Sequence, residues 1–203
     1  MTDPDAFDQF ACEYDQWFED HDTEYQLELS AIRRFLPTGG NGIEIGAGTG
    51  RFTWPLGISL GVEPSAAMRR IALDRGVNVI AGTAESIPVE DCSCDFALMV
   101  TTICFLQTPE IAFLEAHRIL RAEGLIIVGM IDRNSHLGKR YEAEKSKSRF
   151  YKNAGFHPVD GIMASLEKTR FTNVECIQVI LPGDTDEGDQ PMIKQGYGEG
   201  SFV

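Results

Sequence analysis

The chain has 203 residues, a length that fits one domain, and 43% of them are hydrophobic, enough for a sizeable core. The formal net charge of −13 argues against nucleic acid as a partner, because phosphate binding requires a basic face. The chain has five cysteines, an odd number, and no apolar N-terminal signal. Both features favour a protein of the reducing cytoplasm whose thiols are free. No apolar run is long enough to span a membrane.

Acidic and aromatic residues dominate the start of the chain, and no Lys or Arg precedes Arg33. Aromatic residues recur at a helical spacing at Phe7, Phe10, Tyr14, Trp17 and Phe18. This pattern predicts one or two amphipathic helices over 3–28 and a helix over 24–35 that stops at the Pro37–Gly40 breaker. We therefore expect residues 1–36 to form a helical lid over the domain.

Short apolar strands then alternate with helices. We expect strands at 42–45, 58–62, 77–80, 96–100 and 125–131, and helices near 51–56, 65–75 and 109–121. Ser65 is suited to cap the second of these helices, and Pro109 to begin the third. Strands that are apolar on both faces and alternate with helices predict an α/β domain with a doubly wound parallel sheet. Ligands of such sheets bind at the C-terminal ends of the strands.

The alternation of strands and helices ends after residue 131. The basic stretch 132–157 is expected to be an insertion near the active face, where it can pair with the acidic N-terminal segment as a closing lid. A helix over 158–168 and a strand over 174–181 follow, and the last residues resemble a seventh strand cut short, so a continuation past Val203 stays open. We expect one domain over 1–203, divided into the lid 1–36, the core 37–131, the insertion 132–157 and the C-terminal part 158–203.

The most informative segment is the loop Gly46-Ala47-Gly48-Thr49-Gly50 between the first two strands. Glycines let the backbone approach a ligand closely, and such a loop serves NAD, FAD or S-adenosylmethionine (SAM). The spacing is GxGxG rather than the dinucleotide GxGxxG, and Glu44 would repel a pyrophosphate but suits the cationic SAM. Glu63, at the end of the second strand, can accept hydrogen bonds from a ribose diol in either a NAD or a SAM site.

Four sequence blocks resemble those of a known family: GIEIGAGTGRF, GVEPS, AGTAESIPVEDCSCDFALMV, and the helix with Arg118-Ile119-Leu120-Arg121 ahead of Gly124. Their order and gaps are similar to those of the class I SAM-dependent methyltransferases, in particular the UbiE/type-11 group that methylates small molecules. The resemblance covers residues 10–131. It implies a Rossmann-like, mainly parallel seven-stranded sheet whose last strand is antiparallel. The tail YGEGSFV resembles that of a subgroup with some members labelled histamine methyltransferases, which assigns no substrate.

The resemblance also implies a SAM site. The glycine loop would line the methionine part, with Glu44 at its amine, and Glu63 would hold the ribose. Thr83 stands where the family often has Asp, so Glu85 is expected to contact the adenine amino group. The full expected set for SAM and its product S-adenosylhomocysteine (SAH) is Tyr14, Glu44, Gly46, Ala47, Gly48, Gly50, Arg51, Phe52, Glu63, Pro64, Ser65, Met68, Thr83, Ala84, Glu85, Thr101, Thr102 and Phe105.

These expectations favour a SAM-dependent methyltransferase acting on a small-molecule acceptor, as a monomer or homodimer. Two alternatives stay open: a non-catalytic SAM- or SAH-binding protein, and a nucleotide-dependent oxidoreductase, which Glu44 and the loop spacing disfavour. Tyr14 and His136 are weak catalytic candidates, and Trp17, His136 and Tyr151 are candidates for the acceptor site. No metal site is expected, because Cys92-Ser93-Cys94 lacks the spacing of a zinc-binding pair.

Overall fold

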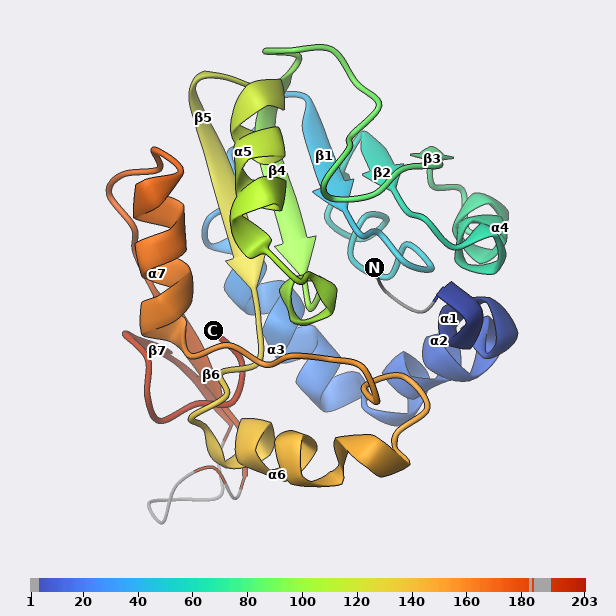
Figure 1. Ribbon diagram of the computed structural model, residues 1–203, viewed down its shortest axis with the longest axis vertical. Coiled ribbons are helices and arrows are strands. Elements are labelled where there is room, and N and C mark those ends of the chain that lie inside the picture. The colour runs from blue at the N-terminus through green and yellow to red at the C-terminus, as the bar shows by residue number, and fades with distance from the viewer. Residues whose placement is uncertain (1–3, 183, 185–190) are drawn as a thin grey trace.

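The centre of the molecule is a five-stranded parallel sheet with the order β3-β2-β1-β4-β5 (Figure 1). The computed structural model describes residues 4–182, 184 and 191–203, so the first three residues of the expected lid lie outside the described part. The strands are β1 (Gly42–Ile45), β2 (Leu60–Val62), β3 (Val79–Ile80), β4 (Cys94–Val100) and β5 (Leu120–Gly129). This order, with β1 in the middle, is that of a doubly wound fold and confirms the predicted fold class.

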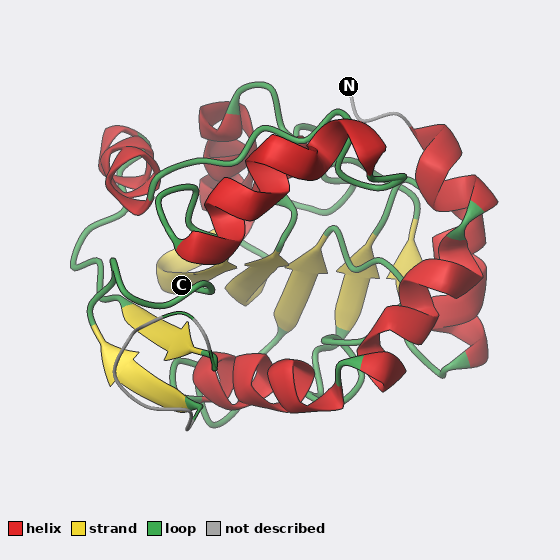
Figure 2. Ribbon diagram, turned by 90° about the horizontal axis from the view of Figure 1, so that it is seen from below, coloured by secondary structure: helices red, strands yellow, loops and turns green. Residues whose placement is uncertain are grey.

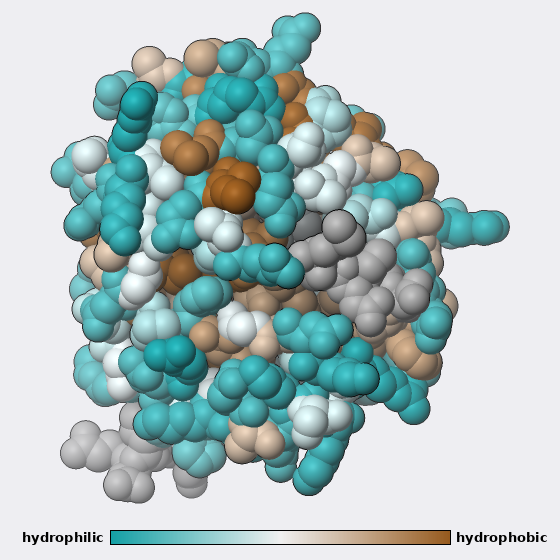
Figure 3. Space-filling view, in the orientation of Figure 1, coloured by the Kyte–Doolittle hydropathy of each residue, from teal (hydrophilic) through white to brown (hydrophobic). Residues whose placement is uncertain are grey.

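Helices cover both faces of the sheet, as its two apolar faces require (Figure 2). On one face, Ile43 and Met99 pack in a cluster with α5 (Pro109–Ile119) and α7 (Val159–Lys168). On the other face, Leu98 packs in a cluster with α3 (Asp22–Arg33). The surface that Figure 3 shows is mainly hydrophilic, which agrees with the high charge of the chain.

The N-terminal segment is helical, as its aromatic spacing predicts. α1 (Pro4–Gln9) and α2 (Ala11–Asp20) run beside α4 (Ala66–Asp74), and α3 then passes beneath the sheet (Figure 1). The α4 helix begins where expected, because the Ser65 hydroxyl accepts a hydrogen bond of 3.1 Å from the Met68 amide.

One local prediction is wrong. Residues 51–57 form hydrogen-bonded turns instead of a helix, because Pro55 cannot donate a backbone hydrogen bond and Gly57 has a φ of +67°. The stretch 132–157, which the sequence predicts to be an insertion, contains the helix α6 (His136–Glu144) followed by a 3-10 turn, η2 (Lys145–Lys147). The Ser135 hydroxyl caps α6 by accepting a bond of 3.0 Å from the Gly138 amide.

The C-terminal strands form a separate antiparallel pair, β6 (Ile177–Ile180) and β7 (Met192–Gln195). The final residues 201–203 lie between this pair and the end of β5. Phe202 forms antiparallel bridges with both Ile131 and Val179, and the Met130 amide donates to the Val203 carbonyl at 2.8 Å. The last segment is thus antiparallel, as expected. It is too short to merge the five strands and the pair into one continuous seven-stranded sheet.

Phe202→Ala should therefore destabilise the protein by about 3–5 kcal/mol, because its buried ring fills the junction between the two sheets. Urea unfolding measures this difference. Met192→Ala is the control, because Met192 on β7 is 50% exposed and its loss should cost less than about 1 kcal/mol. Equal losses for the two variants would contradict the role of Phe202 as the junction.

Candidate functional site

Three strand ends meet at one edge of the sheet and carry the residues that the sequence singled out. The glycine loop follows β1, Glu63 follows β2, and Thr101 and Thr102 follow β4. Gly46 has a φ of +78°, and a Cβ there would overlap the Thr102 hydroxyl, so only glycine fits. Thr101 has a φ of +49°, a conformation rare outside glycine, asparagine and aspartate that concentrates at functional sites.

Glu63 ties the glycine loop to the start of α4. One carboxylate oxygen accepts a hydrogen bond from the Gly48 amide at 2.9 Å, and the other accepts one from the Ser65 amide at 2.8 Å. The side chain is buried, and burial raises the pKa of its carboxyl group. A carboxylate offers about four lone-pair positions, so Glu63 keeps acceptor capacity for the two hydroxyls of a ribose.

A cavity of about 90 Å³ opens above these strand ends. Most of the residues expected in the SAM site line it: Tyr14, Gly46, Gly48, Glu63, Pro64, Ser65, Met68, Thr83, Ala84, Glu85, Thr101, Thr102 and Phe105. Residues from α1, α2, α4 and three strand ends thus converge on one space. The cavity is also lined by Phe7, Val100 and Leu106, which the sequence did not indicate.

Glu44 does not line this cavity. Its carboxylate is buried behind the loop and accepts a hydrogen bond from the Thr53 hydroxyl. Burial, with a further contribution from the charge of Glu63, raises the pKa of Glu44 to about 8. Glu44 is therefore held as a protonated or weakly ionised group next to the glycine loop at neutral pH.

The pKa of Glu44 should make stability depend on pH. Between about pH 4.5 and pH 8 the unfolded chain ionises Glu44 while the folded protein keeps it protonated, so the free energy of unfolding falls as pH rises. In Glu44→Gln this contribution disappears and the bond from Thr53 is kept. The free energy of unfolding of the variant, relative to that of the wild type, should therefore rise by roughly 3–5 kcal/mol on going from pH 5 to pH 8.5. Urea titrations at both pH values measure it, and parallel pH curves would count against the buried proton.

Arg51 also points away from the cavity, toward the lid. Its guanidinium forms ion pairs with Asp15 at 2.7 Å and with Glu19 at 2.5 Å. Asp15 also pairs with Arg75 at 2.9 Å. Although burial opposes it, hydrogen bonds from Arg51 and Arg75 lower the pKa of Asp15 to about 2. These contacts clamp α2 onto the glycine loop and the end of α4.

Asp15→Asn should release this clamp, because it leaves two half-buried guanidinium groups without their shared carboxylate. We expect the amides of α2 to exchange hydrogen about tenfold faster, while those of β1 and β4 keep their rates. The matched control is Asp20→Asn on the same helix, whose exposed carboxylate bonds only Gln16 among the described residues. If α2 were protected equally in both variants, the clamp would have no role in holding the lid.

The remaining expected cofactor residues also lie outside the cavity lining. Ala47 is buried in a small cluster with Ala72 and Val77. Gly50 has a φ of +80° and leaves room for the Val77 side chain. Phe52 packs in the core, 5.5 Å from the Tyr25 ring centroid. These three residues pack on the core side of the glycine loop, away from the cavity.

An aromatic cluster covers the cavity from the lid side. The Phe7 ring meets that of Phe105 at 5.1 Å, and the Tyr14 ring meets that of Phe150 at 5.6 Å. A bridge of 2.6 Å between Arg149 and Glu13 joins the basic stretch to the acidic N-terminal segment, the pairing that their charges predict. The N-terminal helices and the stretch 132–157 therefore contact each other beside the cavity.

The acceptor-site candidates are spread more widely. Tyr151 stacks on Phe105 at 5.8 Å and thus lies behind the cavity wall. Trp17 stacks on His21 at 4.4 Å, and His136 is exposed at the start of α6. Neither Trp17 nor His136 lines the cavity.

Asp8 is a residue that sequence reasoning missed. It reaches from α1 to the start of α4, where its carboxylate accepts bonds from the Ser65 hydroxyl at 2.5 Å and the Ala67 amide at 3.1 Å. Local sequence carries no signal for a contact across 57 residues. The acidic character of the segment was its only visible feature.

A larger cavity, of about 960 Å³, lies elsewhere. It is a groove between β5, α7 and β6 that contains none of the expected site residues. The groove forms because β5 is the edge strand of the described five-stranded sheet. One side of β5 pairs with β4, and no strand of that sheet pairs with its other side. Its lining is mainly hydrophobic and lacks the loop that could bind a nucleotide, so we locate the functional site at the smaller cavity.

A glycine loop after the first parallel strand, an acid after the second and polar residues after the fourth define a class I methyltransferase type of site. The family model described as "Methyltransferase domain" matches residues 43–128. The uncharacterized protein MJ1123 of Methanocaldococcus jannaschii is 42% identical over 98% of this chain and 96% of its own length. The chain belongs to the class I SAM-dependent methyltransferase family.

Solved structures agree. A Thermotoga maritima protein named "SAM-dependent methyltransferase, possible histamine N-methyltransferase" has a TM-score of 0.90 and 48% identity, covering 97% of this chain and 94% of its own. A putative methyltransferase of Haloferax volcanii, solved with its Trm112 activator, has a TM-score of 0.70 over 92% of this chain and 83% of its own. At 17% identity this second likeness shows the fold alone. In the described part of the chain, no helix combines the length and apolarity that a membrane span needs.

Proposed function

We propose that this protein transfers the methyl group of SAM to a small-molecule acceptor. The observation that carries the proposal is the convergence of Gly46, Gly48 and Glu63 on one cavity that an aromatic lid covers. Glu63 would hold the ribose hydroxyls, and the backbone at Gly46 and Gly48 would approach the methionine part. Residues 83–85 and Met68 would contact the adenine.

Binding requires the lid to move outward. The cavity of about 90 Å³ is smaller than the range of roughly 300–1,000 Å³ usual for cofactor sites. Tyr14 occupies the space beside the loop, with its ring 3.7 Å from the position of a Cβ at Gly48. The side chains of Tyr14 and Phe7 would therefore swing away and then close on the bound cofactor, which excludes water.

When bound, SAM supplies a methyl group already activated by its positive sulfur. The protein's own residues would then have to align the acceptor and keep water out rather than provide a strong acid or base. Thr101, Thr102 and Phe105 lie at the cavity end nearest β4 and are suited to this positioning. Because lid and insertion cover the site, little surface is left for docking a macromolecule, which favours a small acceptor.

Glu63→Gln should weaken SAH binding about 100-fold, because it removes a charged acceptor from the proposed ribose contacts. Isothermal titration calorimetry measures the affinity, and Glu90→Gln, an exposed change in the loop between β3 and β4 and outside the cavity lining, is the control. Unchanged affinity in Glu63→Gln would contradict the site. Melting temperatures of both variants separate lost binding from lost folding.

A SAH-release assay across small amines, thiols and phenols tests the reaction itself. Turnover on any of them supports the proposed methyl transfer. Tight SAH binding without turnover on any acceptor would favour the non-catalytic SAM-binding alternative. Binding of NADH without binding of SAM would favour an oxidoreductase.

A further inference from the structure

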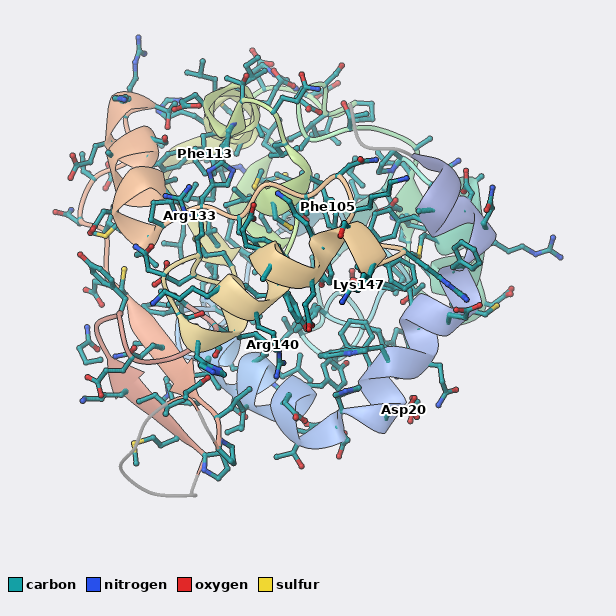
Figure 4. The ribbon with its side chains drawn as sticks, turned by 60° about the horizontal axis from the view of Figure 1, so that its bottom comes forward. Asp20, Phe105, Phe113, Arg133, Arg140 and Lys147 are labelled. Atoms are coloured by element: carbon teal, nitrogen blue, oxygen red, sulfur yellow. The ribbon has the colours of Figure 1, made fainter. Side chains whose placement is uncertain are left out.

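A cavity of about 10 Å³ shares a wall with the proposed methyl-donor cavity, because Thr101 lines both. Cys104 and His157 are the other polar residues of its lining, and the rest of the lining is hydrophobic. Its volume is close to the ~10–15 Å³ that one water molecule needs, so we call it the water-sized cavity. Figure 4 shows Phe105, in the wall of the methyl-donor cavity, behind α6 of the stretch that also carries His157.

The His157 imidazole carries a buried nitrogen without a partner. Its Nε2 is shielded from solvent, and the described part of the chain offers it no hydrogen bond. Thr49 Oγ1 is the one other buried side-chain oxygen or nitrogen there in this condition. An unpaired polar atom away from water is costly, and in native proteins such an atom binds an ordered water or takes part in chemistry. Because His157 lines the water-sized cavity, a water held there can bond to Nε2.

Backbone hydrogen bonds hold the His157 segment against the 3-10 turn η1 (Ile103–Phe105), which follows β4. The Arg133 amide donates to the His157 carbonyl at 3.0 Å, and the Gly155 amide donates to the Cys104 carbonyl at 2.7 Å. These two bonds fix the imidazole beside the strand end that faces the methyl-donor cavity.

The imidazole is suited to accept a proton at neutral pH. Burial lowers the pKa of His157, and the charge of Arg133 lowers it further, while Glu110 opposes the shift. Burial raises the pKa of the Cys104 thiol to about 12, so this neighbour stays uncharged. These three side chains are the charged or titratable groups that face the ring within the described residues. A neutral imidazole has one nitrogen free to accept a proton, and the unpartnered Nε2 can fill that role.

We propose that His157 takes up the proton of the methyl acceptor through the Thr101 hydroxyl and one water in the water-sized cavity. The inference rests on the proposed function and assigns the acceptor an O–H or N–H nucleophile. In the transfer, the acceptor's oxygen or nitrogen bonds the methyl carbon, and the carbon–sulfur bond breaks with its electron pair left on sulfur. The acceptor's proton passes to the Thr101 hydroxyl, which gives its own proton to the water. The water gives a proton to Nε2, and the imidazolium later returns it to solvent.

The first test reads the protonation of His157 by long-range ¹H–¹⁵N NMR on the SAH-saturated protein, and it needs no acceptor. We expect His157 to titrate below the usual range of histidine, with the proton of the neutral ring on Nδ1. His157→Gln identifies its signals among the four histidines. A proton on Nε2 of the neutral ring would overturn the proposal, because that nitrogen could not accept another.

The second test follows SAH release against pH with a phenol or amine that the wild type methylates. The rate constant kcat should fall as pH drops through the pKa of His157, because an imidazolium accepts no proton. In His157→Gln this acid limb should vanish and kcat should drop about 100-fold with little change in KM. Thr101→Ala should lose the same limb, and Thr101→Ser should keep it. His117→Gln, an exposed change on α5 outside both cavities, is the matched control.

An unchanged kcat and acid limb in His157→Gln would overturn the proposal. Melting temperatures of the variants separate a lost proton path from lost folding. Failure of the wild type to bind SAH would instead refute the proposed function, so the two failures are distinguishable.

Discussion

The hydrogen bonds that Glu63 accepts from the Gly48 and Ser65 amides are the constraint on which the site depends. They join the ends of β1 and β2 and set the start of α4 relative to the glycine loop. A carboxylate can do this at the edge of a sheet because charged acceptors form strong bonds to backbone amides. The same group keeps acceptor capacity toward the cavity, so one residue both shapes the loop and offers contacts to a ligand.

Two kinds of contact hold the N-terminal lid in place: ion pairs to the glycine loop and α4, and aromatic rings that pack over the cavity. Asp15 holds Arg51 and Arg75, while Phe7 and Tyr14 pack over the cavity against Phe105 and Phe150. Ion pairs that are only half-buried contribute modestly, and ring contacts can form and break without loss of the fold. Under the proposed function, a lid held in this way would open for the cofactor and close again.

The stretch 132–157 contacts both the N-terminal helices and the wall of the cavity. Phe150 contacts Tyr14 of α2, Tyr151 stacks on Phe105 in the cavity wall, and Tyr141 stacks on Tyr151. Phe105 therefore joins the cavity to the aromatic residues of this stretch.

The sequence by itself determined the parallel sheet, the glycine loop and the acid at Glu63. These depend on local patterns: apolar strands, glycine spacing and a residue's place at a strand end. Only the tertiary structure decided that Arg51 pairs with Asp15, that Glu44 turns to Thr53, and that Asp8 caps α4. The physical reason is distance along the chain. These contacts join segments that are far apart in sequence. The sequence also does not fix the rotamer of a polar side chain, which is selected by the neighbours that pack around it.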